Sequence, residues 1–165
     1  MGIVIKQTAA NTATTFIGFF FGAINVLFLY THILAPVYYG LITVILATAA
    51  IIMPLFAIGA HNTLVKFYSA QQTESQKDGL MLFTLVMPLL ASMFLGLVFW
   101  WFYDGIGNLL SHKNNIVKNY VWHLFLVGLA MAYFEIFYAW SKVHLKSVFG
   151  NFMKEIFGRV CISGL

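Results

Sequence analysis

Ionisable and amide side chains that could do chemistry lie within or beside long apolar stretches of this chain. Glu135 is the only acid inside one of these stretches. A carboxylate at the centre of a membrane helix costs about 2.5 to 3.5 kcal/mol, so it needs a partner or water. Two roles follow for Glu135: a carboxylate that couples transport to an ion or gates a substrate, or an acid that fixes the packing of two helices.

Asn25 and the group His61, Asn62 and Lys66 are the other candidate site residues. Asn25 lies near the middle of its apolar stretch, where its amide needs partners. It therefore either lines a cavity or forms a hydrogen bond between helices. Lys66 follows the second apolar stretch together with His61 and Asn62. Its ammonium group could meet the phosphate of a substrate headgroup, or extend to ordinary anionic lipid at the membrane surface.

Other kinds of site are not indicated. None of the five His is paired at metal-ligand spacing with a carboxylate or thiol nearby, so we expect no metal site. The acids are scattered, and no glycine-rich phosphate loop precedes a helix, so we expect neither an enzyme nor a cofactor. Cys161 is the single cysteine, which excludes a disulfide within the chain. The net charge of +4 is spread without a compact patch, which argues against nucleic acid as a partner.

The elements that carry these residues are predicted to be membrane helices. The sequence is 61% hydrophobic and 8% charged, with a mean hydropathy of +0.88, whereas a soluble domain has about 25% charged residues. Its apolar stretches are long enough to cross a hydrocarbon layer of about 30 Å. They cover about residues 14–34, 41–60, 80–102 and 120–140. The sequence therefore predicts an all-α, polytopic transmembrane helix bundle, with membrane lipid as its surroundings.

The basic residues are concentrated in alternate connectors between these spans. Only Lys113 and Lys118 lie in the second and smaller set. The larger set holds seven of the nine Lys and Arg: Lys6, Lys66, Lys77, Lys142, Lys146, Lys154 and Arg159. Because short loops rich in Lys and Arg stay in the cytoplasm, this asymmetry predicts a cytoplasmic N-terminus.

The remaining segments are interpreted from turn residues and periodicity. Pro36 with the residues 38–40 predicts a tight outer turn, and the glycines of residues 104–119 predict an outer connector rich in turns. Residues 143–165 have apolar side chains at helical spacing, with polar ones between them. They are either an amphipathic helix at the cytoplasmic surface or the start of a fifth span. A fifth span that begins here would make the chain a fragment of a longer protein; the alternative is a complete four-span protein.

Small and polar residues recur at steps of three and four along the first span, and therefore share one face. They are Asn11, Thr15, Gly18, Gly22, Asn25, Leu29 and His32. Gly18 and Gly22 form a small-xxx-small pair, which lets a second helix approach closely in lipid. We expect this stripe to be a packing face.

Three segments resemble a known family. They are Gly18–Asn25, the turn Leu34–Leu41 and the exit of the second span from Pro54 to Phe67. They are similar to the start of bacterial polysaccharide-export flippases. These are the O-antigen and capsule oligosaccharide flippases of the multidrug/oligosaccharidyl-lipid/polysaccharide exporter superfamily. The resemblance implies that residues 1–165 are the N-terminal part of a first bundle, in a transporter of about 12 to 14 helices that opens alternately to either side.

The function that this resemblance implies is transport of a lipid-linked oligosaccharide. The cargo would carry undecaprenyl pyrophosphate and move from the cytoplasmic to the periplasmic leaflet of the bacterial inner membrane. Glycosyltransferases and a polymerase of the same pathway would be partners. Cavity residues of the family are often basic, whereas helices one and two here offer only Lys66, so later helices would have to supply further Arg or Lys. Two alternatives remain: a cation-coupled drug exporter of the same superfamily, and a small membrane scaffold without transport activity.

Overall fold

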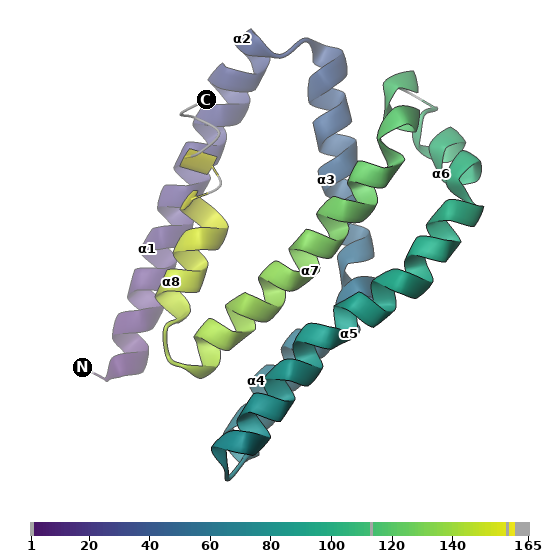
Figure 1. The fold of residues 1–165 in the computed structure, drawn as a ribbon. Helices are drawn as coiled ribbons and strands as arrows, with labels where there is room; N and C mark the ends of the chain where they lie inside the picture. Colours follow the sequence, from purple (N-terminus) through teal and green to yellow (C-terminus); the bar gives the residue numbers. More distant parts are fainter. Residues whose placement is uncertain (1, 113, 158, 161–165) are drawn as a thin grey trace. The chain divides into compact units, whose positions relative to one another are not determined.

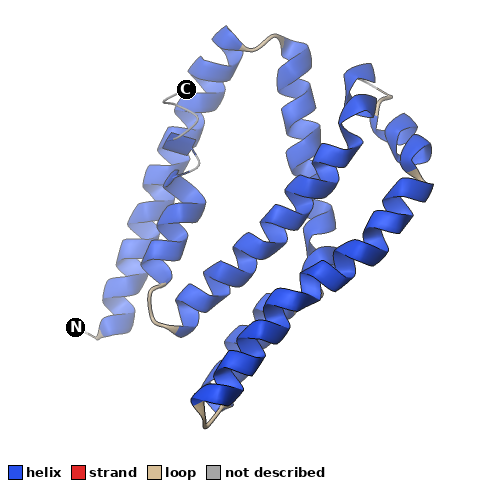
Figure 2. Cartoon of the chain, viewed as in Figure 1, coloured by secondary structure: helices blue, strands red, loops and turns tan. Residues whose placement is uncertain are grey.

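The computed structural model describes residues 2–112, 114–157 and 159–160, and within them all regular structure is helical. Figure 2 shows helices joined by short loops, with no strand among the described residues. Helices long and apolar enough to cross a membrane are Ile5–Ile33, Pro36–Ala57, Glu74–Trp101 and Asn115–Val143. The all-α prediction with four candidate spans is thereby confirmed, and the length and apolar composition of these helices are consistent with a multi-pass membrane protein.

The chain divides into two compact units, Met1–Pro36 with Ser141–Leu165, and Val37–Trp140. In the first unit, α1 (Ile3–Ile24) continues into a π-helical turn and the short α2, and a second helical segment runs beside it (Figure 1). Its remaining elements are η1 (Asn25–Tyr30), α2 (Thr31–Ile33), α8 (Ser147–Phe152) and the π-helix η4 (Met153–Phe157).

The second unit contains three long helices with shorter ones between them (Figure 1). The long helices are α3 (Pro36–Ala57), α5 (Glu74–Trp101) and α7 (Val121–Val143). The shorter ones are α4 (Ala60–Phe67), η2 (Tyr68–Ala70), α6 (Tyr103–Leu110) and η3 (Asn115–Tyr120).

Aromatic rings from all three long helices form the core of this unit. The ring of Phe125 lies edge-on to Phe56 at 4.9 Å and to Phe99 at 5.3 Å between centroids. Gly128 leaves the space for Phe56, because a Cβ atom there would lie 3.0 Å from Cε2 of that ring. In lipid, apolar side chains gain no free energy merely by leaving the surrounding lipid for a neighbouring helix. The close packing of these rings is therefore what stabilises the contact between the helices.

The outer faces of both units remain strongly apolar. Phe19 is 71% exposed, Ile51 75% and Trp101 78%. Large exposed apolar surfaces are costly in water and are the normal outer surface of a helix bundle in lipid. The distribution of exposed side chains therefore agrees with the membrane assignment made from composition.

A backbone break separates α3 from α4. Pro54 lies three residues before the end of α3, and Ile58 and Gly59 follow with φ of +43° and +71°. Glycine adopts this left-handed conformation without strain from a side chain, so Gly59 suits the position. The predicted second span is thus a helix that ends at Ala57, followed by a separate short helix that carries Lys66.

Several predicted boundaries are wrong. The first span is helical from Ile3, well before residue 14. Side chains of this early part donate to the segment after α7, Gln7 to the Leu145 carbonyl oxygen and Asn11 to Ser147 Oγ. Tyr38–Gly40 are not a turn: Pro36 opens α3 with a φ already suited to a helix, and the chain turns at Leu34 and Ala35. The third span starts at Glu74, where the side chain of Thr73 accepts from the backbone N–H of Gln76 in a capping box.

The predicted outer connector 104–119 is also largely helical. α6 forms in spite of Gly105 and Gly107, because Gly107 packs against the side chain of Lys118 and the Tyr103 hydroxyl donates to the Lys118 carbonyl oxygen at 3.1 Å. These tertiary contacts override the weak helix propensity of glycine. Lys113, predicted to lie in the outer connector, and Cys161, the single cysteine, lie outside the described residues.

Candidate functional site

Asn25 is 2% exposed and begins the π-helix η1. Its Nδ2 donates to the carbonyl oxygen of Arg159 at 2.8 Å. Asn25 was expected either to line a cavity or to form a hydrogen bond between helices. The structure shows the hydrogen bond, which joins η1 to the segment after α8. π-Helical turns are rare and are often found at functional sites. The position of Asn25 at the start of η1 is therefore typical of a functional residue.

His61, Asn62 and Lys66 lie together on α4 in the second unit. Lys66 is exposed, with Nζ 5.4 Å from the ring centroid of Phe67. Among the described residues, Nδ1 of the half-buried His61 has no hydrogen-bond partner. Glu135 is half-buried on α7 and has a polar or electrostatic partner. The residues predicted to share a site are therefore divided between the two units, with Asn25 alone in the first.

A line of polar contacts, here called the polar seam, joins α1 to the segment 147–159. On α1 and η1 its residues are Asn11, Thr15, Gly18, Gly22 and Asn25. On the facing segment its residues are Ser147, Asn151, Glu155 and Arg159, each four positions after the last. The stripe predicted as a packing face on the first span is thus occupied by the polar face of the segment after α7.

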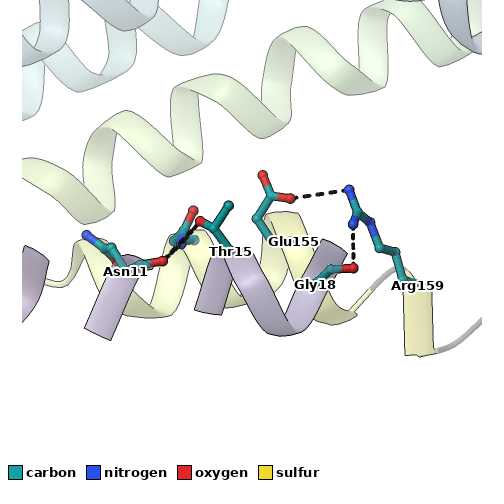
Figure 3. Close-up of polar contacts among 6 residues, drawn as sticks. Asn11, Thr15, Gly18, Glu155 and Arg159 are labelled. Atoms are coloured by element: carbon teal, nitrogen blue, oxygen red, sulfur yellow. Dashed lines mark hydrogen bonds and ion pairs between the residues drawn. The ribbon is translucent and has the colours of Figure 1, made fainter. Parts of the chain in front are cut away.

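Amides and hydroxyls form the first half of the polar seam (Figure 3). Nδ2 of Asn151 donates to the Asn11 carbonyl oxygen at 3.0 Å and to Thr15 Oγ1 at 3.3 Å. Nδ2 of Asn11 donates to Ser147 Oγ at 3.2 Å. Hydrogen bonds between membrane helices contribute about 0.6 to 2 kcal/mol each, so these contacts fix which turns of the two helices meet.

An ion pair lies in the second half of the polar seam. Nη2 of Arg159 lies 3.3 Å from Oε2 of Glu155, and Nη1 donates to the Gly18 carbonyl oxygen, as Figure 3 shows. A Cβ atom at Gly18 would lie 2.5 Å from the Glu155 carbonyl oxygen, and one at Gly22 would lie 2.7 Å from Nη1 of Arg159. The two glycines therefore make the space that the ion pair and its backbone occupy.

This ion pair lies beside the middle of a candidate membrane span. Gly18 and Gly22 both fall in the middle third of the helix Ile5–Ile33. The side chains of Arg159 and Glu155 are 37% and 24% exposed, so the pair is neither sealed in protein nor fully open. Ionised groups at such a depth are expensive unless paired, and they commonly mark pathways for substrates or ions. The pair is the strongest candidate site in the described part of the chain.

Glu155 and Arg159 were not predicted as site residues. Glu135 was predicted as the acid within a span, whereas Glu155 also lies against a span. The missed signal was the spacing of four from Ser147 to Arg159, which matches the stripe on the first span. The segment runs lengthwise along α1 within the first unit (Figure 1).

The described residues contain no group of three or more His, Cys, Asp or Glu that could hold a metal ion. Comparisons with protein-family models, with curated proteins and with solved structures found no match for this chain.

Proposed function

We propose that this chain is the N-terminal part of a flippase for undecaprenyl-pyrophosphate-linked oligosaccharides. The proposal follows the sequence resemblance, and the observation that supports it best is the Arg159–Glu155 pair at the middle of a span. The larger protein would be a two-bundle transporter in the bacterial inner membrane that carries its cargo from the cytoplasmic to the periplasmic leaflet.

Arg159 adds a second cation to Lys66, the one that helices one and two offer. A diphosphate headgroup that crosses the membrane needs positive charge along its path, since an uncompensated anion in hydrocarbon is very costly. A guanidinium group matches phosphate with two parallel hydrogen bonds, which an ammonium group does not. Arg159 is held at mid-span on the Gly18 carbonyl and is partly exposed, so its position suits contact with such a headgroup.

The polar seam also offers groups that bind sugars. Asn11, Thr15 and Asn151 lie on the cytoplasmic side of the ion pair, if the N-terminus is cytoplasmic as the basic residues predict. Amides and hydroxyls donate to and accept from sugar hydroxyls. A lipid-linked sugar with its diphosphate at Arg159 would have its first sugars near these side chains.

Arg159→Lys tests the proposal, because it keeps the charge and removes the planar pair of donors. The full-length protein is reconstituted in vesicles with a fluorescent undecaprenyl-pyrophosphate oligosaccharide, and the transported fraction is measured by its accessibility to a lectin or glycosidase. We expect the transport rate to fall about tenfold or more, because the loss of one hydrogen bond to a charged group costs about 1.5 kcal/mol or more. Lys77→Arg is the matched control, because Lys77 pairs with Glu74 in an exposed contact. Equal transport by both variants would contradict the role of Arg159.

Asn25→Ala and Glu135→Gln test the residues selected from sequence. In cells we expect both variants to lower surface polysaccharide while membrane abundance stays normal, since each removes a polar group from within a span. Surface polysaccharide is measured by gel staining and abundance by immunoblot. Unchanged export in both variants would remove Asn25 and Glu135 from the mechanism.

The two alternative functions predict different results when the gene is deleted and when the protein is reconstituted. A cation-coupled drug exporter predicts drug sensitivity after deletion of the gene, with surface glycan unchanged. A scaffold without transport activity predicts neither drug sensitivity nor transport by the reconstituted protein.

A further inference from the structure

We infer that the turn between α7 and α8, together with the first turn of α1, binds the headgroup of an anionic phospholipid. Lys6 of α1 and the pair Leu145 and Lys146 between the two later helices are here called the basic turn. The two lysines would contact the phosphate of the lipid, and the side chain of Leu145 would contact its acyl chains. The inference does not depend on the cargo of the proposed function.

Both lysines of the basic turn lie at the same end of the first unit. Nε2 of Gln7, the residue after Lys6, donates to the carbonyl oxygen of Leu145, the residue before Lys146. This contact joins α1 to the turn that follows α7. Lys6 and Lys146 are both exposed, so a negatively charged headgroup can reach their ammonium groups.

The net charge of the chain lies entirely in the first unit. The first unit has five Lys and Arg and one acid, whereas the second unit has four of each sign. The acid is Glu155, which pairs with Arg159. Lys142 and His144 precede Leu145 and are exposed, but they have polar or electrostatic contacts of their own, so the inference does not use their charges. The excess of positive charge favours an anionic partner.

Leu145 adopts a backbone conformation that suits glycine. Its φ is +57°. The N–H of Lys146 donates to the Ser141 carbonyl oxygen at 2.8 Å, and the N–H of Leu145 donates to the Lys142 carbonyl oxygen at 3.0 Å. This pair of hydrogen bonds is the Schellman motif at the end of a helix, whose left-handed position is usually a glycine.

The side chain of Leu145 therefore needs an explanation outside the fold. The Cβ atom of a non-glycine residue is strained in the left-handed conformation, and such strain is often found at functional positions. The side chain is 67% exposed, so burial within the described part of the chain does not offset the strain. Contact with the acyl chains of a bound lipid would offset it, because it removes apolar surface from water.

The basic turn would lie at the depth of the lipid headgroups if the candidate spans cross a membrane. One span begins at Ile5 and another ends at Val143, so Lys6, Leu145 and Lys146 all fall within three positions of a span end. At this depth a lysine side chain reaches the phosphates of the headgroups, while apolar side chains contact the acyl chains. The predicted cytoplasmic N-terminus would place this lipid in the cytoplasmic leaflet.

Retention of lipid by the purified protein tests the site. The full-length protein in detergent micelles is mixed with equal amounts of phosphatidylglycerol and phosphatidylcholine, and the bound lipids are counted by native mass spectrometry. We expect the unaltered protein to retain phosphatidylglycerol in preference. Lys6→Gln and Lys146→Gln should each lower this preference about fivefold, the effect of one lysine near an anionic surface. Lys77→Gln is the matched control and should leave it unchanged, because Glu74 already compensates that charge.

Leu145→Gly separates contact with lipid from a role in folding. It removes the apolar side chain and relieves the strain of the left-handed backbone. We expect retention of phosphatidylglycerol to fall about fourfold or more, the effect of at least one CH₂ group removed from apolar contact. The unfolding temperature in detergent should stay the same or rise. A lower unfolding temperature with unchanged lipid retention would contradict the role of Leu145.

Equal retention of the two lipids by the unaltered protein would overturn the inference, as would a preference that Lys77→Gln lowers as much as Lys146→Gln does. Displacement of phosphatidylglycerol by an equal concentration of inorganic phosphate would also overturn it, because the site would then bind a soluble anion. The oligosaccharide takes no part in these measurements. Their failure would therefore leave the proposed function standing, and a failure of transport would leave the lipid site standing.

Discussion

Gly18 is a residue at which an added Cβ atom should strongly lower the stability of the fold. Its Cβ atom would lie 2.5 Å from the Glu155 carbonyl oxygen and 2.9 Å from the attached carbonyl carbon, both of which are backbone atoms. Backbone moves less readily than the end of a side chain, so the two helical segments would have to separate.

We therefore expect Gly18→Ala to lower the free energy of unfolding by about 1 to 3 kcal/mol, the range for overpacked sites. The full-length protein is unfolded in detergent micelles and followed by circular dichroism. Gly79→Ala is the control, because a Cβ atom at that helical glycine meets nothing within 4 Å. A control that is as destabilised as Gly18→Ala would show that the polar seam is not the cause.

At the residue level, the sequence predicted one side of the polar seam and not the other. The spacing from Asn11 to Asn25 indicated a packing face, and that face is occupied. Its partner could not be predicted, because Glu155 and Arg159 are also typical of a helix on the membrane surface. The contact joins two segments more than 130 positions apart, so no local pattern in the sequence indicates it.

Among the elements, α7 is held to α3 through Phe56 and Gly128. Phe56 is fully buried, with Phe125 at 4.9 Å between ring centroids. Removing this ring would leave a cavity where the long helices of the second unit meet.

Phe56→Ala should lower the free energy of unfolding by about 3 to 5 kcal/mol, the usual range for a buried phenylalanine. The matched control is Phe19→Ala, since that ring is 71% exposed. Both variants are compared by detergent unfolding of the full-length protein. Equal destabilisation of the two would mean that the aromatic cluster does not hold these helices together.

Helix existence was easier to predict than helix ends. The apolar stretches were long enough to identify all four candidate spans, whereas the boundaries depended on local contacts. The capping box at Thr73 starts α5 among polar residues, and the contact of Gly107 with Lys118 supports α6 in a segment predicted to be turns. Such contacts change the boundary without changing the apolar pattern.

At the scale of the whole molecule, four helices are expected to cross a lipid bilayer. The apolar exposed faces and the lengths of the helices support this, and the positions of Lys and Arg predict that the N-terminus is cytoplasmic. Both the direction proposed for transport and the depth of the Glu155–Arg159 pair follow from this topology.

Cysteine accessibility in intact cells tests it most directly. Cys161 is first replaced by Ser, and single cysteines are placed at Gln72, between η2 and α5, and at His112, after α6. Both positions are exposed. We expect a maleimide that cannot cross membranes to label His112→Cys in intact cells and Gln72→Cys only after permeabilisation. Labelling of both positions from the same side, or recovery of the protein in the soluble fraction without detergent, would contradict the account.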